Sequence, residues 1–146
     1  MKTDIAYQNE IVKLFHEYAD ESIINGSISD DRVIEEAQKR LGLKIPEQYL
    51  WFLKSFGGGG IAGVRIIGVS KSHILSFVEE TLSYRKQGLP ENLIVVEDSD
   101  EWVECVNADT SQVVTWSAYD EDGVIVAYDS FFEYLIDSFQ EAIDNL

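Results

Sequence analysis

Carboxylate side chains crowd two short segments of the sequence, and closely spaced carboxylates could bind a cation. The segments are 97–104 and 120–122. An EF-hand loop beginning at Asp98 would require an oxygen ligand at its fifth position and glycine at its sixth, where Trp102 and Val103 stand. The run at 120–122 is equally incomplete. We therefore expect solvated acidic turns with no bound metal.

The sequence offers no convincing set of residues for nucleophilic or acid–base catalysis. Cys105 lies in an apolar β-rich run, and the bases that could activate it, His16 and His73, fall in separate predicted helices. A small apolar strand residue is the simpler interpretation of Cys105. The 27 Asp and Glu residues could form glycosidase-like pairs by chance, and nothing selects one pair. We expect no catalytic residue, no cofactor, and a protein that is not an enzyme.

The glycine-rich run at 58–63 spells G-x-G-x-x-G, a pattern that can cradle the pyrophosphate of a dinucleotide. In such a site the run follows a strand and opens a helix, so that the phosphate meets the helix N-terminus. Here the run follows a predicted helix and precedes a predicted strand, and no Gly-Lys-Ser/Thr follows that would make a P-loop. We interpret it as a flexible hinge between a helix and a strand.

The charge of the chain is distributed very unevenly. The net charge is −16, all 11 Lys and Arg residues lie at or before Lys86, and residues 87–146 hold 15 acids. Nucleic acid and anionic membranes are poor partners for such a segment, because both require Lys and Arg. A basic protein is its natural complement, since opposite potentials raise the rate of encounter. The alternative is that the acids only aid solubility.

Tryptophan beside acidic residues is typical of a protein interface, where aromatic anchors contribute much of the binding energy. Trp102 lies among acids, and Trp116 precedes a second acidic run, whereas Trp51 lies in a predicted helix. For each of them, filling the core is the alternative role. The residues that we predict to bind a partner are Asp98, Asp100, Glu101, Trp102, Glu104, Asp120, Glu121 and Asp122.

Hydrophobic periodicity and turn residues predict one α+β domain over residues 1–146. Three helices come first: 4–19, a second capped by Ser29 and ended by Gly42, and a third with Pro46 in its first position. The later elements are a strand at 64–69, a helix at 73–87, strands at 93–97, 102–107, 113–116 and 124–128, and a helix with the capping box Ser130 and Glu133. The closely spaced strands indicate an antiparallel meander, and so a mainly antiparallel sheet flanked by helices.

Cysteine content and apolar segments bear on the compartment. Cys105 is the only cysteine, so no internal disulfide can form, and a reducing cytoplasm is the simpler expectation. Residues 1–10 include no apolar stretch of signal-peptide length. No window approaches the roughly 18 consecutive apolar residues of a transmembrane helix. We expect a cytoplasmic protein with no membrane partner.

Residues 41–59 resemble the signature of the SUKH superfamily, which includes Knr-like and YobK-like proteins. The segment reads Leu-Gly-Leu-Lys-Ile-Pro-Glu-Gln-Tyr-Leu-Trp-Phe-Leu-Lys-Ser-Phe-Gly-Gly-Gly. The signature is a helix ending in leucine, an apolar–Pro pair, a helix rich in Tyr, Phe and Leu, and then glycines. The matching positions are Ile45, Pro46, Tyr49, Phe52, Leu53, Gly58 and Gly59. The strand, helix, acidic β-run and final helix that follow also resemble the YobK-like branch.

The resemblance implies an α+β fold and the role of an immunity or antitoxin protein that binds and neutralises a toxin, often a nuclease. It transfers no catalytic or binding residue, because the matching residues look structural. Combined with the charge, it leads us to expect a basic cognate toxin whose surface the acidic segment masks. The alternative is a non-catalytic scaffold or regulatory interaction module, and a hydrolase using paired carboxylates is a third hypothesis. A toxin gene immediately upstream would favour the first, and an isolated gene the second.

Overall fold

The computed structural model describes residues 2–120 and 123–146, which form an α+β fold as predicted. The elements are α1 (Asp4–Glu17), a 3-10 turn η1 (Ala19–Glu21), β1 (Ser22–Ile24), α2 (Asp31–Leu41), α3 (Glu47–Phe56), β2 (Gly59–Ile61), α4 (Ser76–Arg85), β3 (Leu93–Asp98), β4 (Val103–Asn107), β5 (Val113–Trp116), β6 (Val124–Tyr128) and α5 (Phe131–Asp144). None of these helices combines the length and the apolar character that crossing a bilayer requires.

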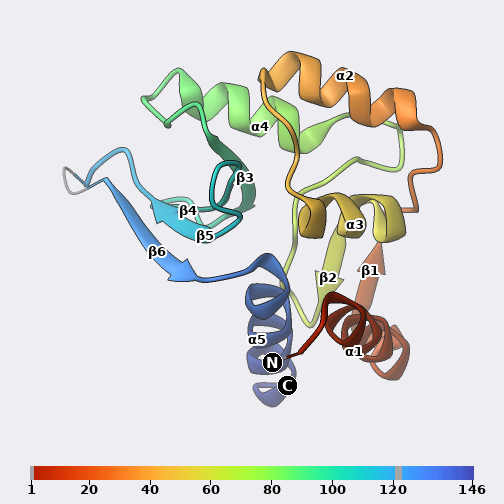
Figure 1. Ribbon diagram of the computed structural model, residues 1–146. Helices are drawn as coiled ribbons and strands as arrows, with labels where there is room; N and C mark the ends of the chain where they lie inside the picture. The colour runs from red at the N-terminus through yellow and green to blue at the C-terminus, as the bar shows by residue number, and fades with distance from the viewer. Residues whose placement is uncertain (1, 121–122) are drawn as a thin grey trace.

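Helices flank the strands on several sides (Figure 1). α2 and α4 run together along one end of the molecule, and α4 packs on β3. α1 and α5 pack on each other at the opposite end, close to both chain termini. α3 lies between these two pairs of helices and packs on α5. Aromatic side chains fill the centre; the largest that are fully buried are Tyr49, Phe52, Phe77, Phe131, Phe132 and Phe139.

Strands β3 to β6 form the predicted meander, a four-stranded antiparallel sheet in the order β3-β4-β5-β6. Its bounds agree with the predicted strands to within one residue at each end. One face joins the main core through Ile94, Val96, Val106 and Val113. The other face forms a smaller apolar cluster of Leu89, Leu93, Val95, Val103, Cys105, Val114 and Trp116. Apolar side chains therefore hold both faces of the inner strands.

The strand predicted at 64–69 does not form. Ile66 makes one isolated bridge to Gly59, through hydrogen bonds of 2.8 and 3.0 Å in the two directions. The next residue, Ile67, donates its N–H to the carbonyl of Val96 in β3 at 2.7 Å. The segment passes between the two sheets, which explains its apolar side chains. Ile66 bonds to the sheet that contains β2, and Ile67 bonds to the sheet that contains β3. One bridge does not make a ladder, so the segment stays irregular although its composition is typical of a strand.

The centre of the glycine run is a buried strand, and not the hinge that we predicted. Residues 59–61 form β2, which pairs antiparallel with β1, a three-residue strand too short to be recognised in the sequence. A Cβ atom at Gly59 would lie 2.0 Å from the carbonyl oxygen of Ile23 in β1, and Gly59 has a φ of +114°. Glycine is therefore needed here for close backbone contact as well as for the turn of the chain.

Two helices begin one residue away from their predicted starts. Asp30 caps α2 in place of Ser29, and its ionised carboxylate suits the positive end of the helix dipole. Pro46 is the extended residue before α3 and not its first helical residue. At α5 the predicted cap is confirmed, since the hydroxyl of Ser130 accepts the N–H of Glu133 at 3.2 Å.

Candidate functional site

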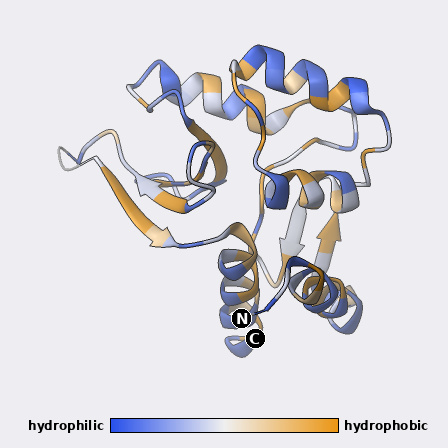
Figure 2. Cartoon of the chain, in the orientation of Figure 1, coloured by the Kyte–Doolittle hydropathy of each residue, from blue (hydrophilic) through white to orange (hydrophobic). Residues whose placement is uncertain are grey.

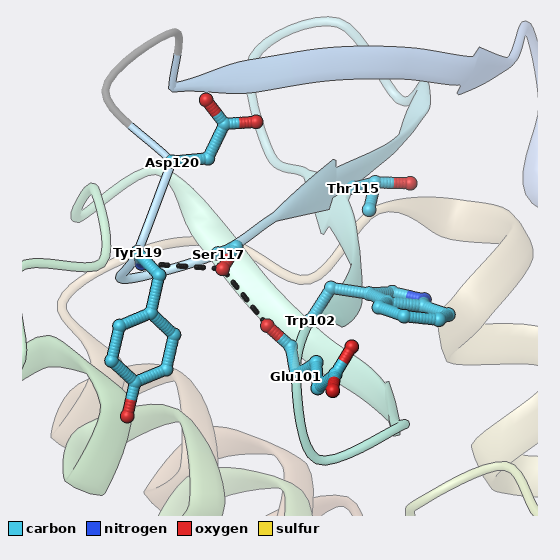
Figure 3. A pocket seen from close by; sticks show the side chains of 6 residues that line it. All are labelled: Glu101, Trp102, Thr115, Ser117, Tyr119 and Asp120. Carbon is cyan, nitrogen blue, oxygen red and sulfur yellow. Dashed lines mark hydrogen bonds between the residues drawn. The ribbon is translucent and has the colours of Figure 1, made fainter.

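Two acidic turns lie side by side at one end of the meander (Figure 3). The first is formed by residues 99–102, between β3 and β4; the second follows β5, where the structure describes residues 117–120 and Gly123. Ser117 joins them, because its hydroxyl donates to the carbonyl of Glu101 at 2.8 Å and accepts the N–H of Tyr119 at 3.2 Å. Alternate turns of an antiparallel meander share one end of the sheet. The topology therefore brings together acids that lie about twenty residues apart in the sequence.

The first turn is held by hydrogen bonds among its own residues and Asp98. The carboxylate of Asp98 accepts the N–H of Asp100 at 2.9 Å, and the N–H of Ser99 donates to the carbonyl of Trp102 at 3.0 Å. Asp100 has a φ of +67°, a conformation that Asp adopts more readily than most residues. These contacts fix the turn, so that Asp100, Glu101 and Trp102 are all exposed.

An open hollow of about 480 Å³ lies over the two turns (Figure 3). Its lining residues are Glu101, Trp102, Thr115, Ser117, Tyr119 and Asp120. Trp102 is 43% exposed and Tyr119 is 89% exposed, so the hollow combines aromatic surface with carboxylates. The sequence marked Trp102 and not Tyr119, although Tyr119 directly precedes the acidic run at 120–122. Exposed aromatic residues of this kind are enriched in protein interfaces.

Glu104 supports Trp102 from the sheet. Its half-buried carboxylate accepts a hydrogen bond of 2.9 Å from the hydroxyl of Thr115 and another from Trp102. Burial raises the pKa of Glu104, and the charge of Glu97 adds to the rise, whereas the two hydrogen bonds oppose it. Glu104 therefore lies beside the hollow, on the face of the sheet that bears Thr115.

Asp98 faces α4 and not the hollow. It accepts a hydrogen bond of 2.9 Å from the hydroxyl of Tyr84 and shares a further one with Glu80. That hydrogen bond, together with burial and the charge of Asp98, raises the pKa of Glu80 to about 7. Burial opposes ionisation of Asp98, but hydrogen bonds from Glu80, the Asp100 amide and Tyr84 outweigh it and lower its pKa. Near neutral pH the two carboxylates thus share one proton.

The remaining predicted residues are placed as follows. Asp120 lines the hollow, and Glu121 and Asp122 lie outside the described residues. In the described part of the chain, every ion pair joins residues between Lys2 and Glu79, including Arg40 with Glu79 at 2.6 Å. The basic partners in these pairs are Lys2, Lys13, Arg32, Arg40 and Lys54, and none of the pairs includes a residue of the acidic turns.

Other chemistry has less support from the fold. Residues 2–120 and 123–146 contain no group of three or more His, Cys, Asp and Glu side chains that could hold a metal ion. Cys105 is fully buried in the smaller apolar cluster. Burial, and then the charge of Glu104, hold the pKa of its thiol far above the ordinary value. His16 lies in the last turn of α1, in a different part of the fold from Cys105.

Comparison with known proteins decides the family. The model of the SUKH_5 family, described as SMI1-KNR4 cell-wall, matches residues 8–140. This chain belongs to the SUKH_5 family. A crystal structure of a protein from Pseudomonas syringae pv. tomato has a similar fold, with a TM-score of 0.68 and 18% sequence identity over 89% of this chain and 98% of that one. At this level of identity, the likeness bears on the fold alone.

The residues that carry the SUKH resemblance lie in the interior of this SUKH_5 protein. Tyr49 is fully buried, its hydroxyl donates to the carbonyl of Ile67 at 2.6 Å, and its ring packs against Phe77 and Phe131. The other matching residues are also buried: Ile45, Pro46, Phe52, Leu53, Gly58 and Gly59. The signature therefore builds the fold, and the candidate site lies outside it.

Proposed function

We propose that this SUKH_5 protein is an immunity protein, acting as a single domain in the cytoplasm, that binds a cognate toxin and neutralises it without catalysis. The observation that carries the proposal is the meeting of two acidic turns around exposed Trp102, in a segment that has no Lys or Arg. The proposed binding residues remain Asp98, Asp100, Glu101, Trp102, Glu104, Asp120, Glu121 and Asp122. The proposed partner is a basic protein, with a nuclease as the favoured class.

In this proposal, charge attraction speeds the encounter with the toxin, and an aromatic anchor contributes to the affinity. A nuclease needs a basic face to bind its substrate, and that face is complementary to the acidic turns. Carboxylates at the rim steer the encounter, while Trp102 and Tyr119 supply apolar area that can be desolvated. Nucleic acid and membranes are not proposed as direct partners.

The test takes the product of the gene immediately upstream as the expected toxin and produces it together with the wild-type protein or with a double variant, Asp100→Lys and Glu101→Lys. The matched control is Glu35→Lys with Glu36→Lys, which makes the same change of charge on the exposed surface of α2. We expect the wild type and the control to restore growth and the turn variant to fail. The affinity of the wild type should fall steeply with salt. Equal protection by all three proteins would contradict masking by the turns.

The second candidate is a scaffold or regulatory module, and the family description, SMI1-KNR4 cell-wall, is the observation that favours it. The same acidic turns would then bind a housekeeping protein. Affinity purification at low and high salt separates the two functions. A single basic toxin that elutes with salt supports immunity, whereas reproducible recovery of cell-envelope proteins supports the scaffold.

A further inference from the structure

Strand β6 is an apolar edge of the sheet that is open to solvent. It reads Val-Ile-Val-Ala-Tyr, without a charged residue or proline, and Figure 2 shows it as a mostly apolar arrow at the edge of the meander. Val124 is 40% exposed, Ile125 56% and Val126 52%. β5 borders it on one side, and no strand in the described residues borders it on the other. Natural sheets usually protect such an edge with charge, proline or a covering element.

The opposite edge of the same sheet is covered. In β3, the N–H of Val95 donates to the hydroxyl of Thr81 in α4 at 3.0 Å. The carbonyl of Val96 accepts the N–H of Ile67 at 2.7 Å. The first four residues of β3 are buried, whereas the first four of β6 are exposed. One edge is therefore closed by this chain itself, and the other is presented outward.

Both faces of β6 are exposed, so the strand extends beyond the helices that cover its neighbours. Val126 lies opposite Val114, and Ile125 lies opposite Thr115, which lines the hollow. The register shifts by one residue at Ala127. Such a bulge bends an edge strand and confines regular pairing to residues 124–126 and their neighbours. This stretch begins where the second acidic turn ends, so the edge continues the candidate site.

Carboxylates around β6 decide what kind of strand could pair with it. The hydroxyl of Tyr128 donates to Asp137 of α5, and Glu141 and Glu104 lie close enough to contribute to the rise of its pKa to about 12. A second copy of this chain, with a net charge of −16, would set acids against acids along such a pairing. An extended segment carrying Lys or Arg would instead place positive charge beside these groups.

We infer that β6 is a docking strand, which adds an extended, basic segment of a partner protein to the sheet by backbone hydrogen bonds. This mode of recognition takes affinity from the main chain and specificity from alternate side chains. Apolar side chains of the partner segment would cover Val124, Ile125 and Val126, and basic ones would meet Asp137 and Glu141. The inference deepens the proposed function and rests on it for the identity of the partner.

The first experiment uses a short capped peptide of alternating lysine and valine as the probe. Hydrogen exchange of the protein is followed residue by residue with and without the peptide. With this peptide we expect slower exchange of the β6 amides. The control is a lysine–valine peptide of the same length that is interrupted by proline; it cannot form a strand and should give no such protection. Equal protection by both peptides, or none at β6, would overturn the inference.

A substitution separates strand pairing from simple charge attraction. Ile125→Asp adds negative charge, which would strengthen attraction of a basic peptide, but it also disfavours an extended strand and removes an apolar pairing position. We expect the affinity for the lysine–valine peptide to fall about tenfold. The matched control is Ile74→Asp, because Ile74 is also 56% exposed and lies away from the sheet. The control should bind like the wild type, and a gain in affinity for Ile125→Asp would refute pairing.

Two further outcomes separate this inference from the proposed function. If the toxin is neutralised by the Ile125→Asp protein as well as by the wild type, while charge reversal of the turns abolishes protection, immunity stands and the docking strand fails. If the peptide protects β6 but the neighbouring toxin is not bound, the docking strand stands and immunity fails. Concentration-dependent dimerisation that Ile125→Asp abolishes, measured by sedimentation, would assign the edge to a second copy and overturn the basic partner.

Discussion

The backbone around β2 and the acidic end of the meander place their side chains in opposite surroundings. Around β2, glycines let backbone atoms of neighbouring segments come into contact. In the segment that follows, the hydroxyl of Tyr49 donates to the carbonyl of Ile67. At the acidic end, Asp100, Glu101 and Trp102 are exposed on a turn. The carboxylate of Asp98 accepts a hydrogen bond from the N–H of Asp100 in this turn. The family signature coincides with the first region. The comparison suggests that stability is concentrated at β2 and partner recognition at the acidic end, and four variants test this division.

Gly59→Ala should have the largest effect. Its Cβ would meet the carbonyl of Ile23 at 2.0 Å, and the positive φ adds strain. We expect a loss of about 3 kcal/mol or more in the free energy of unfolding, measured in urea. Gly63→Ala is the control, because Gly63 also has a positive φ but its added methyl group would meet no atom within 4 Å. Equal losses would show that strain alone, and not close backbone contact, explains the glycine run.

Tyr49→Phe should have a smaller effect in the same region. The change leaves the ring packing intact and removes the hydrogen bond to the carbonyl of Ile67. A half-buried carbonyl that loses its hydrogen-bond partner should destabilise the fold by about 1 kcal/mol. Thermal and urea unfolding measure the loss. Tyr119→Phe, at an exposed position, should leave stability unchanged. If Tyr49→Phe did so as well, this hydrogen bond would have no role in stability.

Glu80→Gln tests the acidic end through pH, because Glu80 shares a hydrogen bond with Asp98 at the start of the first acidic turn. In the folded protein the pKa of Glu80 is raised to about 7, so the fold binds a proton there that the unfolded chain releases at lower pH. The stability that this proton contributes is present at pH 4–5 and is lost as the pH rises toward about 7. The amide of Gln can donate a hydrogen bond, as the protonated carboxyl of Glu80 does, but it does not lose a proton as the pH rises. Because the pair is largely exposed, we expect Glu80→Gln to gain less than about 1 kcal/mol over the wild type at pH 8.

The control for that experiment is Glu36→Gln on the exposed surface of α2, which should follow the wild type at every pH. Urea unfolding at several pH values from 5 to 8 gives the comparison. The difference between Glu80→Gln and the wild type should shrink as the pH falls. A difference that is constant with pH would mean that the carboxylate pair does not titrate in this range.

Asp100→Lys with Glu101→Lys should have a small effect on stability and a large effect on toxin binding. Both residues are exposed, but Lys adopts the positive φ of Asp100 less readily than Asp does, so the unfolding free energy should fall by no more than about 1 kcal/mol. Circular dichroism and urea unfolding check the fold, and calorimetry with the toxin domain checks binding. A large loss of stability would place the acidic turns among the elements that hold the fold, and the division between the regions would fail.

Elements with strong local signals were predicted closely. The four strands of the meander and the Ser130 cap of α5 are as expected, because alternation and capping chemistry are local. The apolar segment 64–69 was assigned wrongly, since its residues pair singly with Gly59 and Val96 in different sheets. β1 was missed because three residues show no periodicity, and it exists only because the glycines of β2 allow the two backbones to approach.

The candidate site divides in the same way between local and tertiary information. The sequence by itself determined the acidic character of the C-terminal segment and the presence of Trp102 within it, because charge and residue type need no fold. Only the tertiary structure decided that the two turns meet through Ser117, that Asp98 turns toward α4, and that β6 is left open. The physical reason is that side-chain partners and free edges depend on how distant strands pair, and strand pairing is set by the whole fold.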